Sequence, residues 1–282
     1  MSKIAIITDS TAYIPKDKVA QFNITVAPQV LIWGEKTYLD DVDIKPTEFY
    51  ERLKKASVMP TTSQVTIAAF KQLFSDLLEQ DYQVLAILVS NKLSGTIDSA
   101  IQAREMLPGK PIEIFDSYTV AMALGFQVLA VAQAAAQGAS MADCLNIAEQ
   151  AKKNTGIVIA VDTLEFLHRG GRIGGAARLV GTALNLKPIL EVKGGRIEPV
   201  ERIRTRKKSL LRVVEIVGER IAGRKPVHLA TLHANAYEDA KFLLEEANRK
   251  FNVDESIFSE VSPVVGTHAG PGTVGLAFMA GM

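Results

Sequence analysis

The chain contains 282 residues, of which 48% are hydrophobic and 22% are charged, and this composition excludes a disordered polymer. The 32 basic and 31 acidic side chains give a net charge of +1, which does not favour nucleic acid as the default partner. A single cysteine, Cys144, excludes an intramolecular disulfide and a multi-cysteine zinc site, and the apolar run before Asp9 is too short for a signal peptide. We therefore expect a cytoplasmic globular protein.

The first half of the chain alternates strand-like and helix-like segments, as a parallel α/β layer requires. Apolar, β-branched runs predict strands at residues 3–8, 26–33, 84–89 and 112–115. Helical spacing of apolar residues predicts helices from residue 15 and over residues 46–55, 67–77, 97–106, 120–136 and 142–153. Residues 59–64 break the pattern and are predicted to form a loop rich in hydroxyl groups.

The segment over residues 120–136 carries no charge and is nearly long enough to cross a membrane. However, Gly125, Gln127 and Gln133 interrupt it, alanine predominates over leucine, and Lys and Arg anchors are missing from its flanks. We therefore expect no integral membrane span. The segment is typical of an alanine-rich helix buried between a sheet and neighbouring helices.

The second half of the chain has a different pattern. Strands are predicted at residues 156–161 and 227–232, and two more, at residues 189–192 and 197–203, surround a Gly-Gly turn that indicates an antiparallel hairpin. Helices over residues 209–221 and 236–251 flank the strand at 227–232, and two strand-like runs close the chain. We predict two domains: residues 1–154, a three-layer α/β/α unit with a parallel sheet, and residues 155–282, a two-layer α+β unit with a mixed sheet.

Hydroxyl groups gather in the loops that follow predicted strands. They occur in residues 8–11, 61–63 and 90–96. A single Ser or Thr at such a position is usually a helix cap. Several together, combined with free backbone N–H groups at helix N-termini, predict a site for a small anionic group such as a carboxylate.

Motifs of the common enzyme classes are absent or incomplete. Residues 270–275 match the dinucleotide-binding glycine pattern, but the seven residues that follow cannot form the helix and strand this motif needs. The chain has no phosphate-binding loop, no nucleophile elbow around Ser94 and no histidine pair at metal-ligand spacing, so we expect no metal and no cofactor. His228 and His233 lie in a strand pattern and are interpreted as structural, whereas His268 is predicted to lie in a Gly-Pro-rich loop.

Two arginine-containing segments can be interpreted either as exposed surface or as binding sites. The loop at residues 169–175 places Arg169 and Arg172 on a glycine-rich turn that could approach a phosphate or the carboxylates of a partner. The strip at residues 202–208 adds a local basic patch. Either segment can equally be an exposed face that offsets acidic residues elsewhere.

Five motifs occur in order along the chain: Thr8-Asp9-Ser10-Thr11, Pro60-Thr61-Thr62-Ser63-Gln64, Leu93-Ser94-Gly95-Thr96, Arg169-Gly170-Gly171-Arg172-Ile173-Gly174 and His268-Ala269-Gly270-Pro271-Gly272. In these motifs, and over its whole length, the chain resembles the DegV family of fatty-acid-binding proteins. The chain departs from the family pattern in having Thr273 where a smaller residue is expected, and Ile97-Asp98 after the Ser94 motif. These departures bear on the length and shape of the acyl chain.

The resemblance implies a bacterial protein with a DegV-like fold that holds a long-chain fatty acid, such as palmitate, in an apolar tunnel between two domains. It implies no catalysis, and a role in lipid transport or fatty acid metabolism. By position, Thr62 and Ser94 would bind the carboxylate, with Ser63 and Gly95 beside them. For members that serve a fatty acid kinase it also implies presentation of the acid to that kinase. Arg169, Arg172 and His268 would then face the phosphate or the partner.

Two alternative hypotheses come from other classes of protein. One is an enzyme, either a hydrolase or a dihydroxyacetone-kinase-like phosphotransferase, that uses Ser94 and His268. The missing elbow and phosphate loop argue against it. The other is a nucleic-acid-binding protein that uses the strip at residues 202–208, whose binding would depend steeply on salt.

Overall fold

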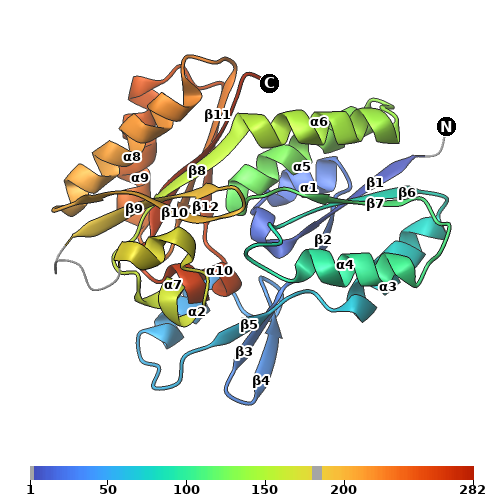
Figure 1. The fold of residues 1–282 in the computed structure, drawn as a ribbon, viewed down its shortest axis with the longest axis horizontal. Helices are drawn as coiled ribbons and strands as arrows, with labels where there is room; N and C mark the ends of the chain where they lie inside the picture. Colours follow the sequence, from blue (N-terminus) through green and yellow to red (C-terminus); the bar gives the residue numbers. More distant parts are fainter. Residues whose placement is uncertain (1–2, 180–185) are drawn as a thin grey trace.

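The computed structural model describes residues 3–179 and 186–282, whose strands form three sheets (Figure 1). The first sheet is entirely parallel and has the order β2-β1-β6-β7. Its strands are β1 (Ile4–Asp9), β2 (Thr25–Ala27), β6 (Gln83–Leu88) and β7 (Ile112–Asp116). The α/β layer with a parallel sheet that the sequence predicts is therefore confirmed.

Helices cover both faces of the parallel sheet, which gives three layers. On one face, Phe70 and Phe74 of α3 (Ile67–Leu78) and Ala100 of α4 (Thr96–Glu105) pack against strand residues such as Val84. The opposite face contacts α5 (Ala121–Ala136), α6 (Met141–Asn154) and α1 (Lys16–Gln21). Because both faces are covered, the strands contain nearly continuous apolar runs.

The second sheet is mixed and contains the strands from the second half of the chain. In spatial order it comprises β10 (Arg196–Ile203), β9 (Lys187–Lys193), β8 (Thr155–Ala160), β13 (Val274–Ala280), β11 (Val227–His233) and β12 (Glu255–Glu260). All neighbours are antiparallel except β11 and β12. The apolar faces of α8 (Arg206–Ile221) and α9 (Tyr237–Lys250) cover one side of this sheet. The predicted mixed sheet and the β9–β10 hairpin are confirmed.

A small antiparallel sheet, in the order β4-β3-β5, was not expected from the sequence. It contains β3 (Val30–Trp33), β4 (Lys36–Leu39) and β5 (Thr61–Ser63), and it extends from the lower end of the molecule in Figure 1. The single strand predicted over residues 26–33 is wrong. It is two strands in different sheets, separated at Pro28, which has no N–H to donate to a ladder. The prediction of a loop at residues 59–64 is also wrong in part, because β3 pairs with β5 there.

The short helices lie near the loops that carry the motifs. They are η1 (Ser10–Ala12), α2 (Pro46–Leu53), α7 (Glu165–Arg169), η2 (Gly174–Leu179) and α10 (Pro263–Ala269). His268 therefore lies on α10 and not in a loop as predicted. Pro263 at the first position favours the start of this helix, but seven residues are too few to show a helical apolar period.

The uncharged segment forms helix α5, and it carries no charge because this helix is buried on two sides. Leu124 and Val128 pack on the parallel sheet, whereas Met122 and Phe126 join a cluster with residues of the mixed sheet. Within residues 3–179 and 186–282, no helix combines the length and the apolar character needed to cross a bilayer.

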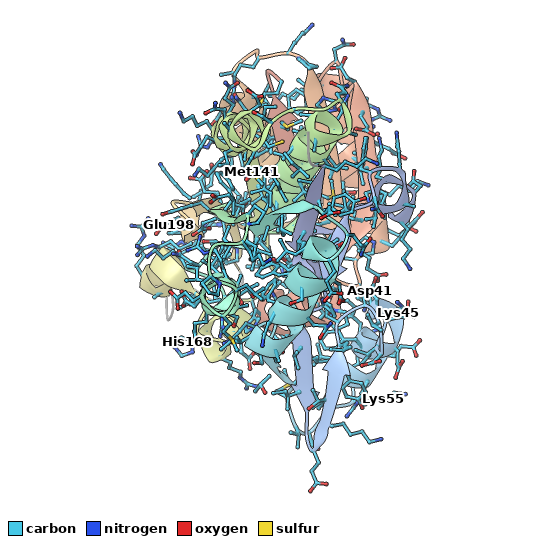
Figure 2. The ribbon with its side chains drawn as sticks, turned by 90° about the vertical axis from the view of Figure 1, so that its right-hand side faces the viewer. Asp41, Lys45, Lys55, Met141, His168 and Glu198 are labelled. Carbon is cyan, nitrogen blue, oxygen red and sulfur yellow. The ribbon has the colours of Figure 1, made fainter. Side chains whose placement is uncertain are left out.

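The apolar face of the mixed sheet packs against elements from the first half of the chain. This cluster brings Phe49 of α2 and Phe126 of α5 together with Ile157 and Leu232. Figure 2 shows His168 and Glu198 on one flank of the molecule and Asp41 and Lys45 on the other. The domain boundary near residue 154 stays a prediction, although every strand of the mixed sheet follows it.

Candidate functional site

A largely apolar cavity lies where the two main sheets, β5 and α10 meet. About 880 Å³ of space there, solvent at the opening included, is free of protein atoms. Its apolar walls come from both halves of the chain: Val89, Leu93, Val120, Ala121, Ile157, Ile159, Leu167, Val192, Ile197, Leu232, Val264, Val265 and Ala269. Polar side chains line it as well: Thr11, Gln29, Thr62, Ser63, Gln64, Ser94, Arg172, His268 and Thr273. The cavity is thus an apolar space with a polar region, as suits an amphipathic ligand.

Several of the predicted site residues meet in the polar region. The Oγ1 atom of Thr62 lies 2.7 Å from Nε2 of His268, although 206 residues separate them in the sequence. On a neighbouring loop, Ser94 Oγ lies 2.8 Å from Thr96 Oγ1. The Oγ1 atom of Thr96 also accepts a hydrogen bond from the side-chain amide of Gln29. The structure therefore brings the Thr62, Ser94 and His268 motifs together around one cavity.

The other two predicted carboxylate residues have different positions. Ser63 lines the cavity directly. Gly95 does not line it, but precedes α4 and lies against Gln64: a Cβ atom added to Gly95 would be 3.2 Å from Nε2 of Gln64. Gly95 therefore allows Gln64 to pack on the loop that carries Ser94.

Arg172 provides a positive charge in this cavity. Its guanidinium donates to the backbone oxygens of Leu93 and Gly170, at 3.0 and 2.7 Å. Among the residues that the structure describes, no carboxylate forms an ion pair with Arg172. Backbone carbonyls hold the side chain in place without neutralising it, so the cavity has an uncompensated positive charge.

His268 is uncharged at neutral pH. Burial and, secondarily, the nearby charge of Arg172 lower the pKa of His268 to about 4. Its Nδ1 atom is buried and has no hydrogen-bond partner among the described residues. A neutral imidazole can donate or accept a hydrogen bond, and it adds no second charge beside Arg172.

Gly170 determines how closely His268 approaches the arginine loop. A Cβ atom on Gly170 would lie 2.0 Å from Nδ1 of His268, so any side chain there would displace the ring. The backbone at Gly170 has φ −77°, which other residues adopt readily. Close packing, and not backbone conformation, therefore requires glycine at this position.

Arg169, predicted beside Arg172, is outside the cavity. It is exposed at the end of α7 and forms an ion pair with Glu165 one turn earlier, at 2.6 Å. The structure therefore separates the two arginines of this motif: Arg172 lines the cavity and Arg169 faces solvent.

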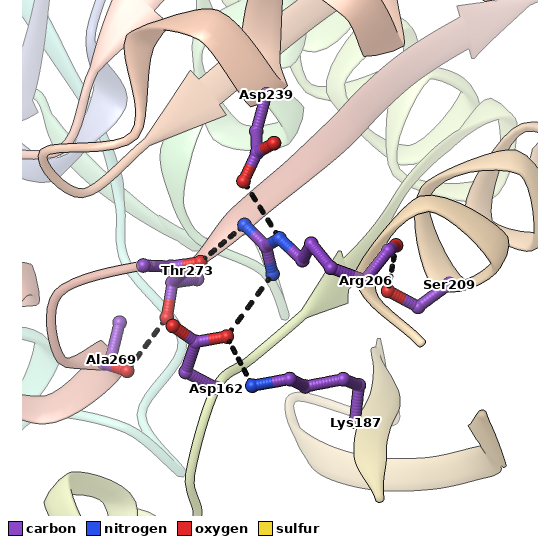
Figure 3. Close-up of polar contacts among 8 residues, drawn as sticks. Asp162, Lys187, Arg206, Ser209, Asp239, Ala269 and Thr273 are labelled. Carbon is purple, nitrogen blue, oxygen red and sulfur yellow. Dashed lines mark hydrogen bonds and ion pairs between the residues drawn. The ribbon is translucent and has the colours of Figure 1, made fainter. Parts of the chain in front are cut away.

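Arg206 holds the turn that follows α10 (Figure 3). Its guanidinium donates to the backbone oxygen of Gly272 at 2.6 Å and to Asp239 at 2.7 Å, and lies 3.6 Å from Asp162. Inside the same turn, Thr273 donates to the backbone oxygen of Ala269 at 2.7 Å. One member of the basic strip at residues 202–208 is thus directed into the protein, where it supports the segment next to His268.

The geometry bears on the two enzyme alternatives. Ser94 and His268 line the same cavity, but the hydroxyl of Ser94 pairs with Thr96 and the imidazole of His268 pairs with Thr62. A nucleophilic serine needs the base within hydrogen-bond reach, and this pair is not formed. Across residues 3–179 and 186–282, no group of three or more His, Cys, Asp or Glu side chains is placed to hold a metal ion.

Sequence reasoning missed Gln29 and the cavity walls. Gln29 is only 2% exposed and supports Thr96, but one glutamine between two strands gives no signal in the sequence. The wall residues Ile157, Ile159 and Leu232 come from strands of the mixed sheet that read as ordinary core strands. Their role depends on how the two sheets pack, which local patterns do not encode.

Comparison with known proteins identifies the family. Residues 3–281 match the model of the DegV family of uncharacterised proteins. A DegV domain-containing protein of Halalkalibacterium halodurans is 36% identical over 280 residues, covering 99% of both chains. A Thermus thermophilus DegV family structure, described by its fatty acid binding, is 32% identical, has a TM-score of 0.94 and covers 99% of both chains. The structure of DegV from Bacillus subtilis, described as a fatty acid binding protein, is 36% identical, has a TM-score of 0.90 and covers 99% of this chain and all of that one. This chain therefore belongs to the DegV family.

Proposed function

We propose that this protein binds one long-chain fatty acid in the cavity without chemically changing it. The observation that carries the proposal is Arg172, a positive charge whose only partners among the described residues are backbone carbonyls, in a space whose walls are otherwise mostly apolar. A ligand that satisfies both features has an anionic head and an apolar tail. The fatty acid binding described for the Thermus thermophilus and Bacillus subtilis relatives supports the same ligand class.

The carboxylate would lie between Thr62 and Ser94, with Ser63 beside them and the N-terminus of α4 after Gly95. The first N–H groups of α4 lack partners within the helix and favour an anion there. The family resemblance assigned Arg169, Arg172 and His268 to a phosphate or a partner, and this proposal gives them two different roles. Arg172 and His268 join the carboxylate site because they line the same cavity, and Arg169 stays available to a partner.

The tail would supply most of the affinity. Removing a palmitate-length chain of about 14 methylenes from water is favourable by roughly 11 kcal/mol, before the cost of ordering the chain. A charge-assisted hydrogen bond to the head contributes about 1.5 to 3 kcal/mol. The apolar walls thus determine how tightly a fatty acid binds, and the polar region determines which way it points.

Titration with a fluorescent fatty acid tests the head-group assignment. Replacing both Thr62 and Ser94 by alanine should weaken binding by about a hundredfold or more, because two hydrogen bonds to a buried charge are lost. The matched control replaces Thr37 and Ser75, hydroxyls that do not line the cavity, and should bind as the wild type does. Equal affinity in the two double variants would contradict the assignment.

The arginine loop provides a second matched pair. Arg172→Ala should weaken binding severely, because the carboxylate would be buried without its counter-charge. Arg169→Ala, in the same motif but exposed, should leave binding unchanged. If Arg169→Ala also lost the lipid, the cavity would not be where the acid binds.

We further propose that the protein presents the acid to a separate fatty acid kinase, which places it in fatty acid metabolism or lipid transport. Ser94 and His268 pair with Thr96 and Thr62 and not with each other, which supports a carrier and not a hydrolase. Alone, the protein should neither hydrolyse acyl esters nor consume ATP. Together with a fatty acid kinase, lipid-loaded protein should support acyl phosphate formation, and Arg169→Ala should reduce this formation while retaining lipid. Ester hydrolysis that Ser94→Ala abolishes would replace the carrier proposal with the hydrolase.

A further inference from the structure

A second, open depression lies on the other side of β11 from the fatty acid cavity. Leu232 lines the cavity, whereas the next residue, His233, lines the depression. The depression lies where β11 and β12 end and α9 begins, at the carboxyl ends of two parallel strands. Ligands of α/β proteins commonly bind at this place in a sheet.

Three rings form one wall of the depression. His233 lies 6.0 Å from Tyr237 and 5.3 Å from Phe258, and the rings of Tyr237 and Phe258 are 5.1 Å apart, all measured between ring centroids. Tyr237 is 58% exposed and Phe258 is 39% exposed, so the two large rings face solvent. Clustered aromatic faces are attractive to cations, and above all to alkylated ammonium groups.

The remaining wall is acidic. Four carboxylates line the depression: Asp162, Glu238, Asp239 and Glu260. No Lys or Arg of the described residues lines it. Lys187 pairs with Asp162, and Arg206 reaches both Asp162 and Asp239 (Figure 3). Glu238 and Glu260 have no ion pair with any described residue. Two negative charges therefore remain without a counter-charge.

His233 is the buried polar group that points to a ligand here. It is 5% exposed, and its Nδ1 atom has no hydrogen-bond partner among the described residues. Burial lowers the pKa of His233, which favours the neutral ring, and a neutral ring does not repel a cation.

The N-terminus of α9 by itself would favour an anion. However, Glu238 and Asp239 occupy its first turn and already complement the helix dipole. A bound anion would also face Glu260 at close range. The charge of the depression as a whole therefore favours a cation. A metal ion fits poorly, since the described residues include no group of three ligands suited to one.

We propose that the depression formed by His233, Tyr237, Phe258 and Glu260 is a binding site for an organic cation, either an alkylammonium or a guanidinium group. Such a group has apolar carbon to lie on the rings and positive charge to face the carboxylates. It can come from a free amine or from the side chain of a partner protein. This proposal is independent of the bound fatty acid.

NMR of protein labelled with ¹³C-histidine tests the site directly. Addition of tetramethylammonium chloride, with ionic strength held constant by sodium chloride, should shift the ring resonance of His233 saturably at millimolar concentrations. The resonances of His168, His228 and His268 act as references for folding and should not move. A His233 resonance that stays in place or moves without saturation, both with this probe and with the one below, would overturn the proposal.

A second probe distinguishes the sources of the cation. Acetyl-arginine methylamide carries a guanidinium as a protein side chain would. Tighter binding of this probe than of tetramethylammonium would indicate a partner's arginine, and the reverse would indicate a free alkylated amine. Either result supports the organic-cation site.

Variants show whether the rings and the acid form the site. Tyr237→Ala, an exposed change that should not disturb folding, should weaken probe binding at least threefold, roughly the effect of one lost cation–π contact. Glu260→Gln should weaken it similarly. The matched control Glu245→Gln changes an exposed carboxylate of α9 outside the depression and should have no effect. A loss with Glu245→Gln as large as that with Glu260→Gln would show a non-specific charge effect and contradict the site.

Discussion

The ionisation of His268 follows from its surroundings and not from its own chemistry. Its ring is held between Thr62 and Gly170, out of contact with most of the solvent and near the charge of Arg172. Both influences disfavour the protonated form. Arg172 is therefore the charged member of the pair, and His268 contributes hydrogen bonding.

This arrangement predicts how His268 titrates. In the ligand-free protein its midpoint should lie near pH 4, well below the value of an exposed histidine. Because a bound carboxylate opposes the charge of Arg172 and attracts a proton, addition of oleate should raise the midpoint. Arg172→Ala should also raise it, by removing the repulsion. NMR titration of the histidine ring measures both shifts, and a midpoint near 6.5 without ligand would contradict the account.

A second prediction at this scale concerns Gly170. Gly170→Ala should displace the His268 ring and weaken fatty acid binding, because the new methyl group would overlap Nδ1. Combining it with His268→Ala removes the overlap. The double variant should therefore bind no more weakly than His268→Ala alone, and a double-mutant cycle of the affinities measures this coupling. Purely additive losses would show that Gly170 acts through some other contact.

Among the elements, α10 is the one on which the site depends most, and a buried carboxylate fixes its beginning. Asp40 accepts a hydrogen bond from the backbone N–H of Val264 at 3.0 Å and another from Ser10 at 2.7 Å. It therefore connects the small sheet, η1 and α10. Burial raises the pKa of Asp40 to about 6.

Asp40 should make stability depend on pH. Because its pKa is higher in the folded protein than in the unfolded chain, the folded state binds the proton more tightly, and stability falls as pH rises from about 4 to 7. The free energy of unfolding should fall by about 3 kcal/mol in total, since a tenfold change in proton affinity is worth about 1.4 kcal/mol. Denaturant unfolding at several pH values should show a shallower slope in Asp40→Asn than in the wild type, the remainder coming from other buried carboxyl groups such as Asp9, whose pKa burial also raises. Asp17→Asn, an exposed control, should retain the wild-type slope, and an unchanged slope in Asp40→Asn would refute the assignment.

How far the sequence predicts the elements depends on where their stability comes from. Residues 84–89 were predicted as a strand because their apolar run is itself the signal for burial on both faces. β5 and α10 were missed because tertiary contacts stabilise them: β5 pairs with β3, and α10 is held by Asp40. The two elements that carry Thr62 and His268 are thus those that local patterns could not reveal.

For the candidate site, the sequence predicted the residues better than their arrangement. The hydroxyls of Thr62 and Ser94 and the cation of Arg172 follow from motif and residue type, and the structure collects them in one cavity. The separation of Arg172 from Arg169 could not be predicted, since it arises where α7 ends between them.

The whole molecule places an apolar cavity where the two main sheets meet, and its walls come from strands and helices on both sides of residue 154. A ligand there would contact both sheets at once. One cluster of buried side chains joins the two sheets, and most of the apolar walls of the cavity belong to it. This arrangement matches a ligand whose tail is removed from water on binding.

The central claim is that this protein holds a fatty acid, and mass spectrometry of an organic extract of the purified protein tests it most directly. The account predicts an acid of about 14 to 18 carbons, the range whose tail burial is worth roughly 10 kcal/mol or more, in near-stoichiometric amount. The Thr62→Ala, Ser94→Ala double variant should release much less. Wild-type protein that yields no fatty acid, and takes up none when offered palmitate or oleate, would contradict the account.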